Sequence, residues 1–361
     1  MTAPDHRPRF PERRLAVGVL GVGAIARTAH LPAYAKSGVP VVAGCDRSAG
    51  AEALGEVLPA GAAAYDDVDA FLADPRVEVV DIATGPAGRV ELVERCLAAG
   101  KHVLAQKPVV TTPEDLAALE EVAARGAARG LRVAVNQNAR WAPAWRVTTQ
   151  LVRAGAVGEV VGVTHLHDKP LPPIAGTPFD DLDHMLLSDY LVHWFDITRC
   201  WLEGARVDSV TAHDSRVPGQ PAGARNPWHA SVHVATAGGA TAAVRVVGDA
   251  RTRTGGCPFW VHGTRGTIRG SILLGSDRVE LEADGSATSY ALEGQWFVDG
   301  FAGAMGELQC AVAEGREPEN AVAHVAASVR LGAAAVAAAA TGAPVTGLDL
   351  ELTAPGTGAG A

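Results

Sequence analysis

The chain has 361 residues, of which 48% are hydrophobic and 20% are charged, and its formal net charge is −9. This composition is typical of a folded globular protein, and the length predicts two domains. The negative charge argues against a surface that follows nucleic-acid phosphates, so we expect no nucleic-acid partner. The five cysteines are scattered without a Cys-x-x-Cys pair, which favours a reducing cytoplasm over a disulfide framework.

The two ends of the chain are predicted to lack a fixed structure, and two apolar runs bear on localisation. Residues 1–13 hold three prolines and several charges and are predicted to be a flexible leader, and residues 351–361 a disordered tail. Arg13-Arg14 with the apolar run 15–20 has some features of an export signal, but that run is better explained as a first strand. The Ala-rich run around 332–344 is too short and interrupted to span a bilayer, so no membrane partner is expected.

From residue 15 the chain alternates predicted strands and helices, which is typical of a parallel, doubly wound α/β sheet. The predicted strands are 15–20, 39–44, 77–83, 103–105 and 131–135. The predicted helices are one ending at Tyr34, then 49–57, 68–73, 90–99, and one that begins after Thr112. Gly100 is a helix-ending residue, and Thr112 before Pro113 and two acids is a helix start. Residues 14–138 are therefore predicted to form a Rossmann-type dinucleotide-binding domain.

After about residue 140 the pattern changes. Helices are predicted at 143–154, 185–203 and about 321–340, and strands at 232–235, 243–247, 260–261, 267–268 and 279–282. Gly238-Gly239 and Asp284-Gly285 are hairpin turns by sequence. Residues 139–350 are predicted to form an α+β domain with an open-faced, mostly antiparallel sheet. Because an open face exposes apolar surface, we expect a homodimer or homotetramer.

A glycine fingerprint, Gly21-x-Gly23-x-x-Ala26, directly follows the first predicted strand. In such a fingerprint the first glycine makes the tight turn, the second lets the backbone approach a pyrophosphate, and the third small residue allows close helix packing. Asp46 ends the next strand about 20 residues further on, where a carboxylate can bind the ribose hydroxyls of NAD. Arg47 and Ser48 could instead hold a 2′-phosphate, so NAD is favoured with NADP as the alternative.

The other predicted cofactor contacts lie at this turn and at the ends of later strands. They are Ala24, Ile25, Arg47, Thr84, Gln106 and Lys107. The structural alternative to a cofactor site is a Gly-rich turn followed by a solvent-facing aspartate.

Two further segments carry side chains suited to hydride transfer. His193 can act as the base for an alcohol proton, because the ordinary pKa of histidine is about 6.5. Asp189 lies four residues earlier, so on one helix both would share a face and the carboxylate could orient the imidazole. Lys107, before Pro108, supplies positive charge where an alkoxide develops. The alternatives are a solvated lysine and a surface Asp–His pair, although the apolar run 187–201 fits the latter poorly.

Other residues have weaker assignments. Polar and aromatic side chains after the last predicted Rossmann strand could bind or stack on a substrate, with interdomain packing as the alternative; they are Asn136, Asn138, Arg140 and Trp141. His165 and His167 are expected to point to opposite faces of a strand, which argues against a shared metal, and no metal is expected. Trp194 is predicted to lie in the core, and Asp196 to be a helix-face charge or an interdomain hydrogen bond. The bond before Pro108 is as compatible with cis as with trans.

Over roughly residues 14–350 the chain resembles the Gfo/Idh/MocA family of glucose–fructose oxidoreductases, inositol dehydrogenases and rhizopine-catabolism oxidoreductases. Besides the fingerprint, the likeness rests on Ala99-Gly100-Lys101-His102-Val103-Leu104, Lys107-Pro108, Asp189-x3-His193, Gly263-Thr264-Arg265-Gly266-Thr267 and Thr341-Gly342-Ala343-Pro344-Val345. The resemblance implies a Rossmann domain followed by an open-faced α/β domain, and a tightly held nicotinamide cofactor. It also implies Lys107, Asp189 and His193 as the catalytic residues.

The chain departs from the family pattern at three places. Gln106 stands where the family usually has glutamate, Arg89 stands where a Pro-Asn-x-x-His turn usually ends, and Asp183-His184-Met185 replaces a frequent glycine triplet. These side chains are expected to line the substrate entrance, and His184 is assigned to substrate binding. Specificity is therefore expected to differ from that of inositol dehydrogenases.

The sequence predicts a soluble, cytoplasmic NAD(P)-dependent dehydrogenase or reductase. It would transfer a hydride between the nicotinamide and a secondary alcohol or ketone carbon of a sugar, sugar acid or cyclitol. Two alternatives remain. One is a lyase, glycosidase or isomerase that acts by transient oxidation and recycles its cofactor, and the other is a catalytically silent NAD(P)-gated sensor.

Overall fold

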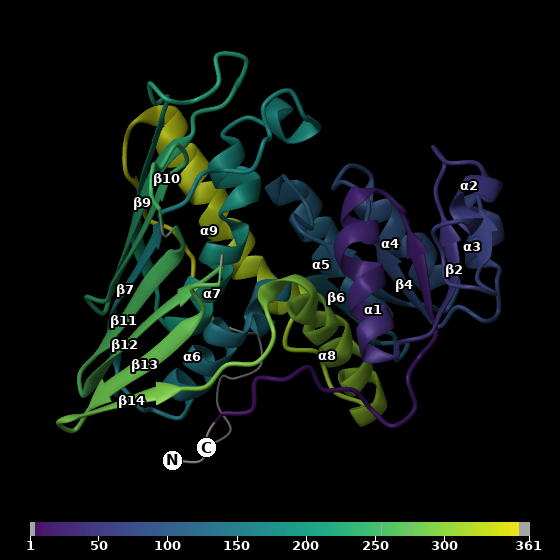
Figure 1. Cartoon of the computed structure of the whole chain (residues 1–361), viewed down its shortest axis with the longest axis horizontal. Coiled ribbons are helices and arrows are strands. Elements are labelled where there is room, and N and C mark those ends of the chain that lie inside the picture. Colours follow the sequence, from purple (N-terminus) through teal and green to yellow (C-terminus); the bar gives the residue numbers. More distant parts are fainter. Residues whose placement is uncertain (1–3, 254, 274, 354–361) are drawn as a thin grey trace. The chain divides into compact units, whose positions relative to one another are not determined.

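The computed structural model describes residues 4–253, 255–273 and 275–353. Its contacts divide the chain into two compact units (Figure 1). The first, which we call the parallel unit, comprises residues 7–141 and 296–325. The second, the mixed unit, comprises the described parts of 1–6, 142–295 and 326–361. Residues 296–325 thus group with the parallel unit, although the sequence assigned them to the range 139–350.

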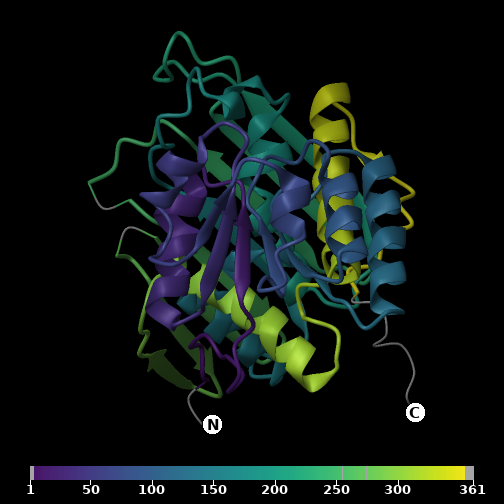
Figure 2. The same ribbon diagram turned by 90° about the vertical axis from the view of Figure 1, so that its right-hand side faces the viewer.

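The parallel unit contains a six-stranded parallel sheet among its described residues, in the order β3-β2-β1-β4-β5-β6. The strands are β1 (Val17–Leu20), β2 (Val41–Cys45), β3 (Ala63–Tyr65), β4 (Val79–Ile82), β5 (His102–Gln106) and β6 (Val133–Asn136). Figure 2 shows these purple and blue strands side by side, with helices of the same unit next to them. The order reverses between β1 and β4, the place where such sheets bind ligands outside the carboxyl ends of their strands. The predicted doubly wound fold is confirmed.

The helices predicted for the parallel unit occur in the predicted order, together with further helices that were not predicted. They are η1 (Ala26–His30), α1 (Leu31–Ser37), α2 (Ala51–Gly55), α3 (Val68–Leu72), α4 (Arg89–Ala98), α5 (Pro113–Ala127), η2 (Asn138–Trp141), η5 (Trp296–Gly300) and α8 (Phe301–Glu314), of which η2, η5 and α8 were not predicted. Two predicted ends are confirmed. Thr112 accepts a hydrogen bond from the Asp115 amide at 3.1 Å, and Gly100 has φ of +75° after α4.

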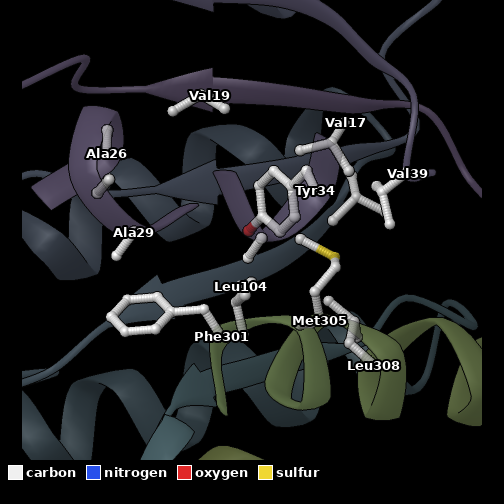
Figure 3. Close-up of a cluster of buried hydrophobic side chains, with 14 of the residues drawn as sticks. Val17, Val19, Ala26, Ala29, Tyr34, Val39, Leu104, Phe301, Met305 and Leu308 are labelled. Carbon is white, nitrogen blue, oxygen red and sulfur yellow. The ribbon is translucent and has the colours of Figure 1, made fainter. Parts of the chain in front are cut away.

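The core of the parallel unit includes a helix that the sequence analysis missed. Phe301, Met305 and Leu308 of α8 are buried with Val17 of β1 and Tyr34 of α1 (Figure 3). Most residues of α8 itself are small or apolar, so it lacks a clear polar stripe of the kind that reveals an amphipathic helix. Close approach explains the small residues, because a Cβ on Gly303 would lie 2.3 Å from Trp141 Cγ.

We expect Gly303→Ala to destabilise the protein, because the added methyl group overlaps the buried indole of Trp141. Overpacking of a core costs about 1–3 kcal/mol, which outweighs the gain of up to about 1 kcal/mol from alanine's helix propensity. Thermal unfolding of the two proteins measures the difference. Gly55→Ala is the matched control, since a Cβ there meets nothing within 4 Å. Equal melting temperatures for Gly303→Ala and the wild type would show that Trp141 moves aside without cost.

The mixed unit contains a nine-stranded sheet among its described residues, in the order β14-β13-β12-β11-β7-β10-β9-β8-β15. The described neighbours are antiparallel except for β7 and β10. The strands are β7 (Val160–His167), β8 (Val207–Ser215), β9 (His229–Thr236), β10 (Thr241–Val247), β11 (Cys257–Gly263), β12 (Gly266–Ile272), β13 (Arg278–Ala283), β14 (Ser286–Tyr290) and β15 (Val345–Thr346). Both predicted hairpin turns are confirmed, with positive φ at Gly239 and at Asp284 and Gly285.

Helices of the mixed unit lie on one face of its sheet (Figure 1). They include α6 (Pro143–Arg153), η3 (Pro178–Asp181), η4 (Leu186–Tyr190), α7 (Val192–Trp201) and most of α9 (Val322–Thr341). Helix α9 has 20 residues and a mean hydropathy of 1.6, so by length and composition alone it could cross a membrane. The helix predicted at about 321–340 is confirmed, whereas the expectation of no membrane span rested only on the Ala-rich run 332–344, which is shorter than this helix. However, 56% of its apolar window is buried inside the protein, which is also the pattern of a core helix.

The two ends of the described chain are held by hydrogen bonds and strand pairing. The His6 imidazole lies 3.2 Å from the Glu293 carbonyl, and the Glu293 amide donates to His6 Nε2 at 3.0 Å. Glu351 forms an antiparallel bridge with Arg206. The rest of the predicted tail, 354–361, lies outside the described residues.

Candidate functional site

The predicted cofactor residues follow the carboxyl ends of neighbouring strands in the parallel unit. Gly21, directly after β1, has φ of +93°, and a Cβ there would lie 2.8 Å from Thr84 Cγ2 and 3.0 Å from Thr84 N. Glycine is therefore required by both conformation and space. A Cβ at Gly23 would meet nothing within 4 Å, so the space above that backbone is open. Ala24 and Ile25 begin the helix, whose first turn includes a bond from Arg27 N to Gly23 O of 3.1 Å.

Asp46, directly after β2, is fixed by the fingerprint turn and by its own loop. One carboxylate oxygen accepts from Val22 N at 2.9 Å, and the other accepts from Ser48 N at 2.8 Å. A carboxylate has about four acceptor positions, so two ribose hydroxyls could still bind. The open backbone at Gly23 and the fixed carboxylate fit an NAD-type dinucleotide. Arg47 and Ser48 are exposed beside them, as a 2′-phosphate site would also require.

Arg89 does not line an entrance, contrary to expectation, because its side chain is buried and only 1% exposed. Its guanidinium donates to the main-chain oxygens of Thr84 at 2.6 Å, Gly85 at 2.9 Å and Gln106 at 2.5 Å. Burial lowers the pKa of Arg89 to about 10, although the Asp81 charge opposes that shift. Arg89 therefore remains a cation at neutral pH and joins the loop after β4 to the end of β5.

A buried polar network, which the sequence analysis missed, lies beside this strand end. His30 Nδ1 lies 2.6 Å from Asp81 Oδ2, and the Tyr34 hydroxyl donates to the same oxygen at 2.6 Å. Gln106 Nε2 lies 2.9 Å from His30 Nε2, and the Lys107 amide donates to Gln106 Oε1 at 2.8 Å. Burial and the Asp81 charge raise the pKa of Tyr34. The only sequence signal was an aspartate inside an apolar strand.

Lys107 is half-buried at the end of β5, and the peptide bond between it and Pro108 is cis. Gln106, predicted to contact the cofactor, points its amide into the buried network instead of presenting it at the surface. Its backbone is nevertheless part of the carboxyl edge. Lys107 is thus the described cation that directly follows β5 at the edge where Gly21 and Asp46 follow β1 and β2.

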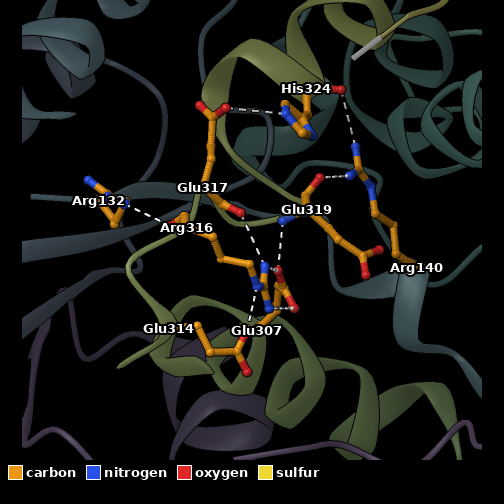
Figure 4. Close-up of polar contacts among 8 residues, drawn as sticks. All are labelled: Arg132, Arg140, Glu307, Glu314, Arg316, Glu317, Glu319 and His324. Atoms are coloured by element: carbon orange, nitrogen blue, oxygen red, sulfur yellow. Dashed lines mark hydrogen bonds and ion pairs between the residues drawn. The ribbon is translucent and has the colours of Figure 1, made fainter. Parts of the chain in front are cut away.

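The three residues after β6 that were predicted to bind substrate are buried and make contacts within the parallel unit. The Arg140 guanidinium donates to the main-chain oxygen of Glu319 and, at 3.4 Å, to that of His324 (Figure 4). Asn138 Oδ1 accepts from Trp296 Nε1 at 2.6 Å, and Trp141 lies against Gly303. These contacts favour a packing role for Asn138, Arg140 and Trp141, and their assignment to substrate stays a prediction.

Asp189 and His193 belong to the mixed unit, where both are buried. The segment predicted as a helix over 185–203 is helical over most of its length, but it is not one regular α-helix. Asp189 lies in the π-helical segment η4, His193 lies in α7, and Leu191 between them has φ of −83° and ψ of 1°. The i, i+4 argument for a shared face therefore does not apply, because a π turn holds more residues than an α turn. Burial of both side chains also does not fit an exposed surface pair.

His184 precedes η4 in a left-handed conformation, with φ of +48°. Its Nδ1 lies 2.8 Å from Asp214 Oδ2, and its main-chain oxygen accepts from Leu187 N at 2.7 Å and from Ser188 N at 2.9 Å. A non-glycine residue in this region costs about 1 kcal/mol or more. The side chain is 26% exposed, so His184 is the one predicted substrate residue with partial access to solvent.

His165 and His167 correct another expectation. Residues two apart on a strand share a face, and both histidines are buried on the helix-covered side of β7. His165 Nε2 lies 3.2 Å from Thr198 Oγ1, and His167 Nε2 lies 2.7 Å from the Tyr190 hydroxyl. Burial lowers the pKa of each histidine to about 3. Within residues 4–253, 255–273 and 275–353, no group of three or more His, Cys, Asp or Glu could hold a metal ion.

Two lesser predictions concerned α7. Trp194 is 2% exposed, which confirms that it lies in the core. Asp196 is also buried, and its Oδ1 accepts from Ser328 Oγ of α9 at 2.7 Å. It therefore makes a hydrogen bond within the mixed unit rather than presenting a helix-face charge.

Comparisons with known proteins cover both parts of the chain. Residues 15–137 match a family described as "Oxidoreductase family, NAD-binding Rossmann fold", and residues 145–269 match the "GFO/IDH/MocA C-terminal domain". An inositol 2-dehydrogenase from an Arthrobacter species is 30% identical over 241 residues, 66% of this chain and 68% of that protein. "Inositol 2-dehydrogenase 2" of Saccharopolyspora erythraea is 29% identical over 205 residues, 56% of this chain. The match spans 58% of that relative's length, less than two thirds.

Among solved structures, an oxidoreductase from Agrobacterium radiobacter in complex with NAD⁺, L-tartaric acid and magnesium has a TM-score of 0.80. It is 22% identical, and the match covers 92% of this chain and 98% of that one. At this identity the likeness shows a shared fold.

Proposed function

Because this chain belongs to the Gfo/Idh/MocA family of oxidoreductases, whose N-terminal domain is an NAD-binding Rossmann fold, we propose that it is a polyol dehydrogenase or reductase. It transfers a hydride between the nicotinamide and a secondary alcohol or ketone carbon of a sugar, sugar acid or cyclitol. The observation that carries this proposal is the carboxyl edge of the parallel sheet. There the Gly21 turn, the fixed carboxylate of Asp46 and the cation of Lys107 follow three strands of one sheet.

The cofactor site consists of Gly21, Gly23, Asp46 and the start of the helix after β1. The open backbone at Gly23 and the helix N-terminus would face the pyrophosphate, and Asp46 would bind the adenosine ribose. The bound nicotinamide supplies the hydride acceptor or donor. Arg47 and Thr84 border the same site, since Arg47 follows Asp46 and Thr84 contacts the position of Gly21.

We expect Asp46→Ala to weaken NAD binding by about tenfold or more, since hydrogen bonds to a charged group contribute about 1.5–3 kcal/mol. The loss for NADP should be smaller, because the carboxylate repels a 2′-phosphate. Dissociation constants for NADH and NADPH from nicotinamide fluorescence measure both. Asp66→Ala removes an exposed carboxylate after β3 and serves as the control. Equal losses for the two cofactors would contradict the ribose assignment.

Three residues are proposed to act on the reacting carbon. His193 takes the hydroxyl proton as the hydride leaves and returns it in the reverse direction. Lys107 stabilises the negative charge that develops on the substrate oxygen. Asp189 orients the imidazole or holds a neighbouring substrate hydroxyl. The family resemblance and the chemistry of a secondary alcohol support these roles. The burial of Asp189 and His193 also limits the access of water, which would otherwise compete with the substrate for hydrogen bonds to these side chains.

The substrate class rests on relatives rather than on this chain alone. The two relatives described above are named as inositol 2-dehydrogenases, which act on a cyclitol. This chain replaces the frequent glycine triplet before η4, and His184 presents a half-buried imidazole there. We therefore propose a polyhydroxylated substrate different from inositol, with His184 as one of its contacts.

The test follows reduced-nicotinamide absorbance with NAD⁺ and NADP⁺ separately across sugars, sugar acids and cyclitols. Signal with any of them supports the dehydrogenase, its cofactor and its substrate class together. Product without accumulation of reduced cofactor would instead indicate a lyase, glycosidase or isomerase that recycles the cofactor. If the protein binds the cofactor but no compound changes the absorbance or yields a product, an NAD(P)-gated sensor would be favoured.

The sheet of the mixed unit supports a proposal about assembly. Thr164, Trp260 and Ala243 are cross-strand neighbours on the face opposite the helices, and all three are only half-buried. An open face of this kind is commonly covered by another subunit, so we propose a homodimer or homotetramer. Light scattering gives the mass of the assembly in solution, and a Trp260→Glu variant, which places a charge on this face, should lower that mass.

The five cysteines are free and buried, which supports a reducing, cytoplasmic location.

A further inference from the structure

The side chain of Gln106 has only one orientation that satisfies its neighbours. The amide of Lys107 can only donate, so the atom that faces it at 2.8 Å must be the Gln106 oxygen. A carboxamide has oxygen at one end and NH₂ at the other. The NH₂ group therefore faces His30 Nε2 at 2.9 Å.

This orientation fixes the proton of His30. An NH₂ group donates, so His30 Nε2 must accept, and the single ring proton must lie on Nδ1. Nδ1 lies 2.6 Å from Asp81 Oδ2, which is the acceptor that such a proton needs. The Nδ2 group of Asn136, at 3.5 Å, is a second donor on the Nε2 side.

Protein groups surround the His30 ring, which has no exposure to solvent. Tyr34 donates its hydroxyl proton to the same oxygen of Asp81, and the Phe301 ring of α8 lies 4.9 Å from the imidazole, centroid to centroid. His30, Tyr34 and Asp81 each have 0% exposure, and the charge of Arg89, the first residue of α4, acts on Asp81. A neutral imidazole between the Gln106 amide donor and Oδ2 of Asp81 is the arrangement that gives both ring nitrogens of His30 a partner.

The same glutamine is fixed through its backbone. Arg89 Nη1 donates to the Gln106 main-chain oxygen at 2.5 Å, while the side chain binds His30 and the Lys107 amide. Two of the three departures from the family pattern, Gln106 and Arg89, therefore meet at one residue. An ionised glutamate here would present only acceptors, so it would offer no donor to His30 Nε2.

We propose that Gln106 is a positioning residue for Lys107, and that it acts by joining the Lys107 amide to a neutral, Nδ1-protonated His30. Arg89 completes the attachment by binding the main chain of the same residue. The strand end that carries Lys107 is thus held by Asp81 and Arg89 as the charged groups. This inference rests on the proposed function only in giving Lys107 a catalytic role.

The first test reads the ring protons directly, in protein labelled with ¹⁵N-histidine. The wild type should show His30 with a protonated Nδ1 and an unprotonated Nε2 at neutral pH. Gln106→Glu should show both nitrogens protonated, because the donor to Nε2 is gone. Gln150→Glu, which adds the same charge on α6, should leave the His30 spectrum unchanged. An imidazolium or an Nε2-protonated ring in the wild type, or an unaltered ring in Gln106→Glu, would overturn the proposal.

The second test separates the bond to Lys107 from the bond to His30. Gln106→Met removes the acceptor of the Lys107 amide but leaves Asp81 to hold the Nδ1 proton. Hydrogen exchange at the Lys107 amide should quicken about five- to tenfold, as the loss of one ordinary hydrogen bond predicts. His30 should stay neutral. This variant adds no charge, so it also decides the matter if Gln106→Glu does not fold. Unchanged exchange at Lys107 would contradict the positioning role.

The third measurement connects position to turnover. In the dehydrogenase assay, Gln106→Met should lower kcat about tenfold while KM for the alcohol changes less than about twofold. An equal effect on both constants, or none on kcat, would reject positioning. The His30 spectra need no substrate. If no compound in the substrate panel reduces the cofactor, only the proposed function is contradicted. If the enzyme is active but His30 is not protonated on Nδ1 alone, only this inference is contradicted.

Discussion

Replacing His193 by alanine is expected to lower the rate of alcohol oxidation by about 10²- to 10⁴-fold, the contribution of a positioned general base. The hydride can leave the carbon only as the hydroxyl proton leaves, and without His193 that proton must pass to water. Cofactor affinity should not change, because the predicted NAD contacts all belong to the parallel unit and His193 belongs to the mixed unit. Initial rates from reduced-nicotinamide absorbance, with NADH binding by fluorescence, measure the two effects separately.

Two further measurements sharpen this expectation. His213→Ala removes an exposed histidine from β8 of the same unit and should keep full turnover. Added imidazole should restore part of the activity of His193→Ala, since the alanine leaves space for the missing ring. If His193→Ala turns over like the wild type, the base is another group. If it loses NADH binding together with turnover, the substitution has disturbed the structure instead.

The parallel unit was predictable because most of its strands are buried on both faces. Such strands are continuous apolar runs, and Gly100 and Thr112 mark helix ends by backbone chemistry that acts locally. Strand β3 was missed because Ala63–Tyr65 is three residues long and has no alternating pattern. Helix α8 was missed for the opposite reason, because its small apolar residues carry no periodic polar signal.

The residues at the carboxyl edge of the sheet were also predictable, while the buried polar network beside that edge was not. Parallel strands end at one edge of the sheet, so residues directly after β1, β2 and β5 had to gather there. The pairing of His30 with Asp81 and Gln106 depends on how a helix packs on the sheet, and sequence spacing carries no trace of it. Arg89 was wrongly predicted to line the substrate entrance, because a charged residue after a glycine turn suggests exposure and its buried contacts leave no trace in the sequence.

The segment that carries Asp189 and His193 shows the limit of periodicity. Its residues are almost all buried, so the sequence has no polar face from which to tell a π turn from an α turn. The left-handed backbone at His184 was equally unforeseen, because non-glycine residues seldom adopt it and the contact of this side chain with Asp214 is not visible in the sequence.

Lys107→Met is expected to lower kcat by about 10²- to 10³-fold, which corresponds to about 3–4 kcal/mol of lost stabilisation of the developing alkoxide. The thermal stability should change little, because the side chain is half-buried and its removal leaves the Lys107 amide bond to Gln106 in place. Lys107→Arg keeps the charge but changes its shape and position, so it should retain more activity than Lys107→Met. Rates at saturating cofactor, together with melting temperatures, compare the three proteins.

The comparison between the two variants decides what Lys107 contributes. If charge is the contribution, arginine rescues part of kcat and methionine does not. If both variants are equally impaired, shape or a specific hydrogen bond matters more than charge. Lys36→Met is the matched control, because Lys36 lies in the same unit with a side chain 58% exposed, and it should keep full turnover. A Lys107→Met enzyme with normal kcat would mean that the alkoxide is stabilised by another group, and the role of the Gln106 network would then be structural.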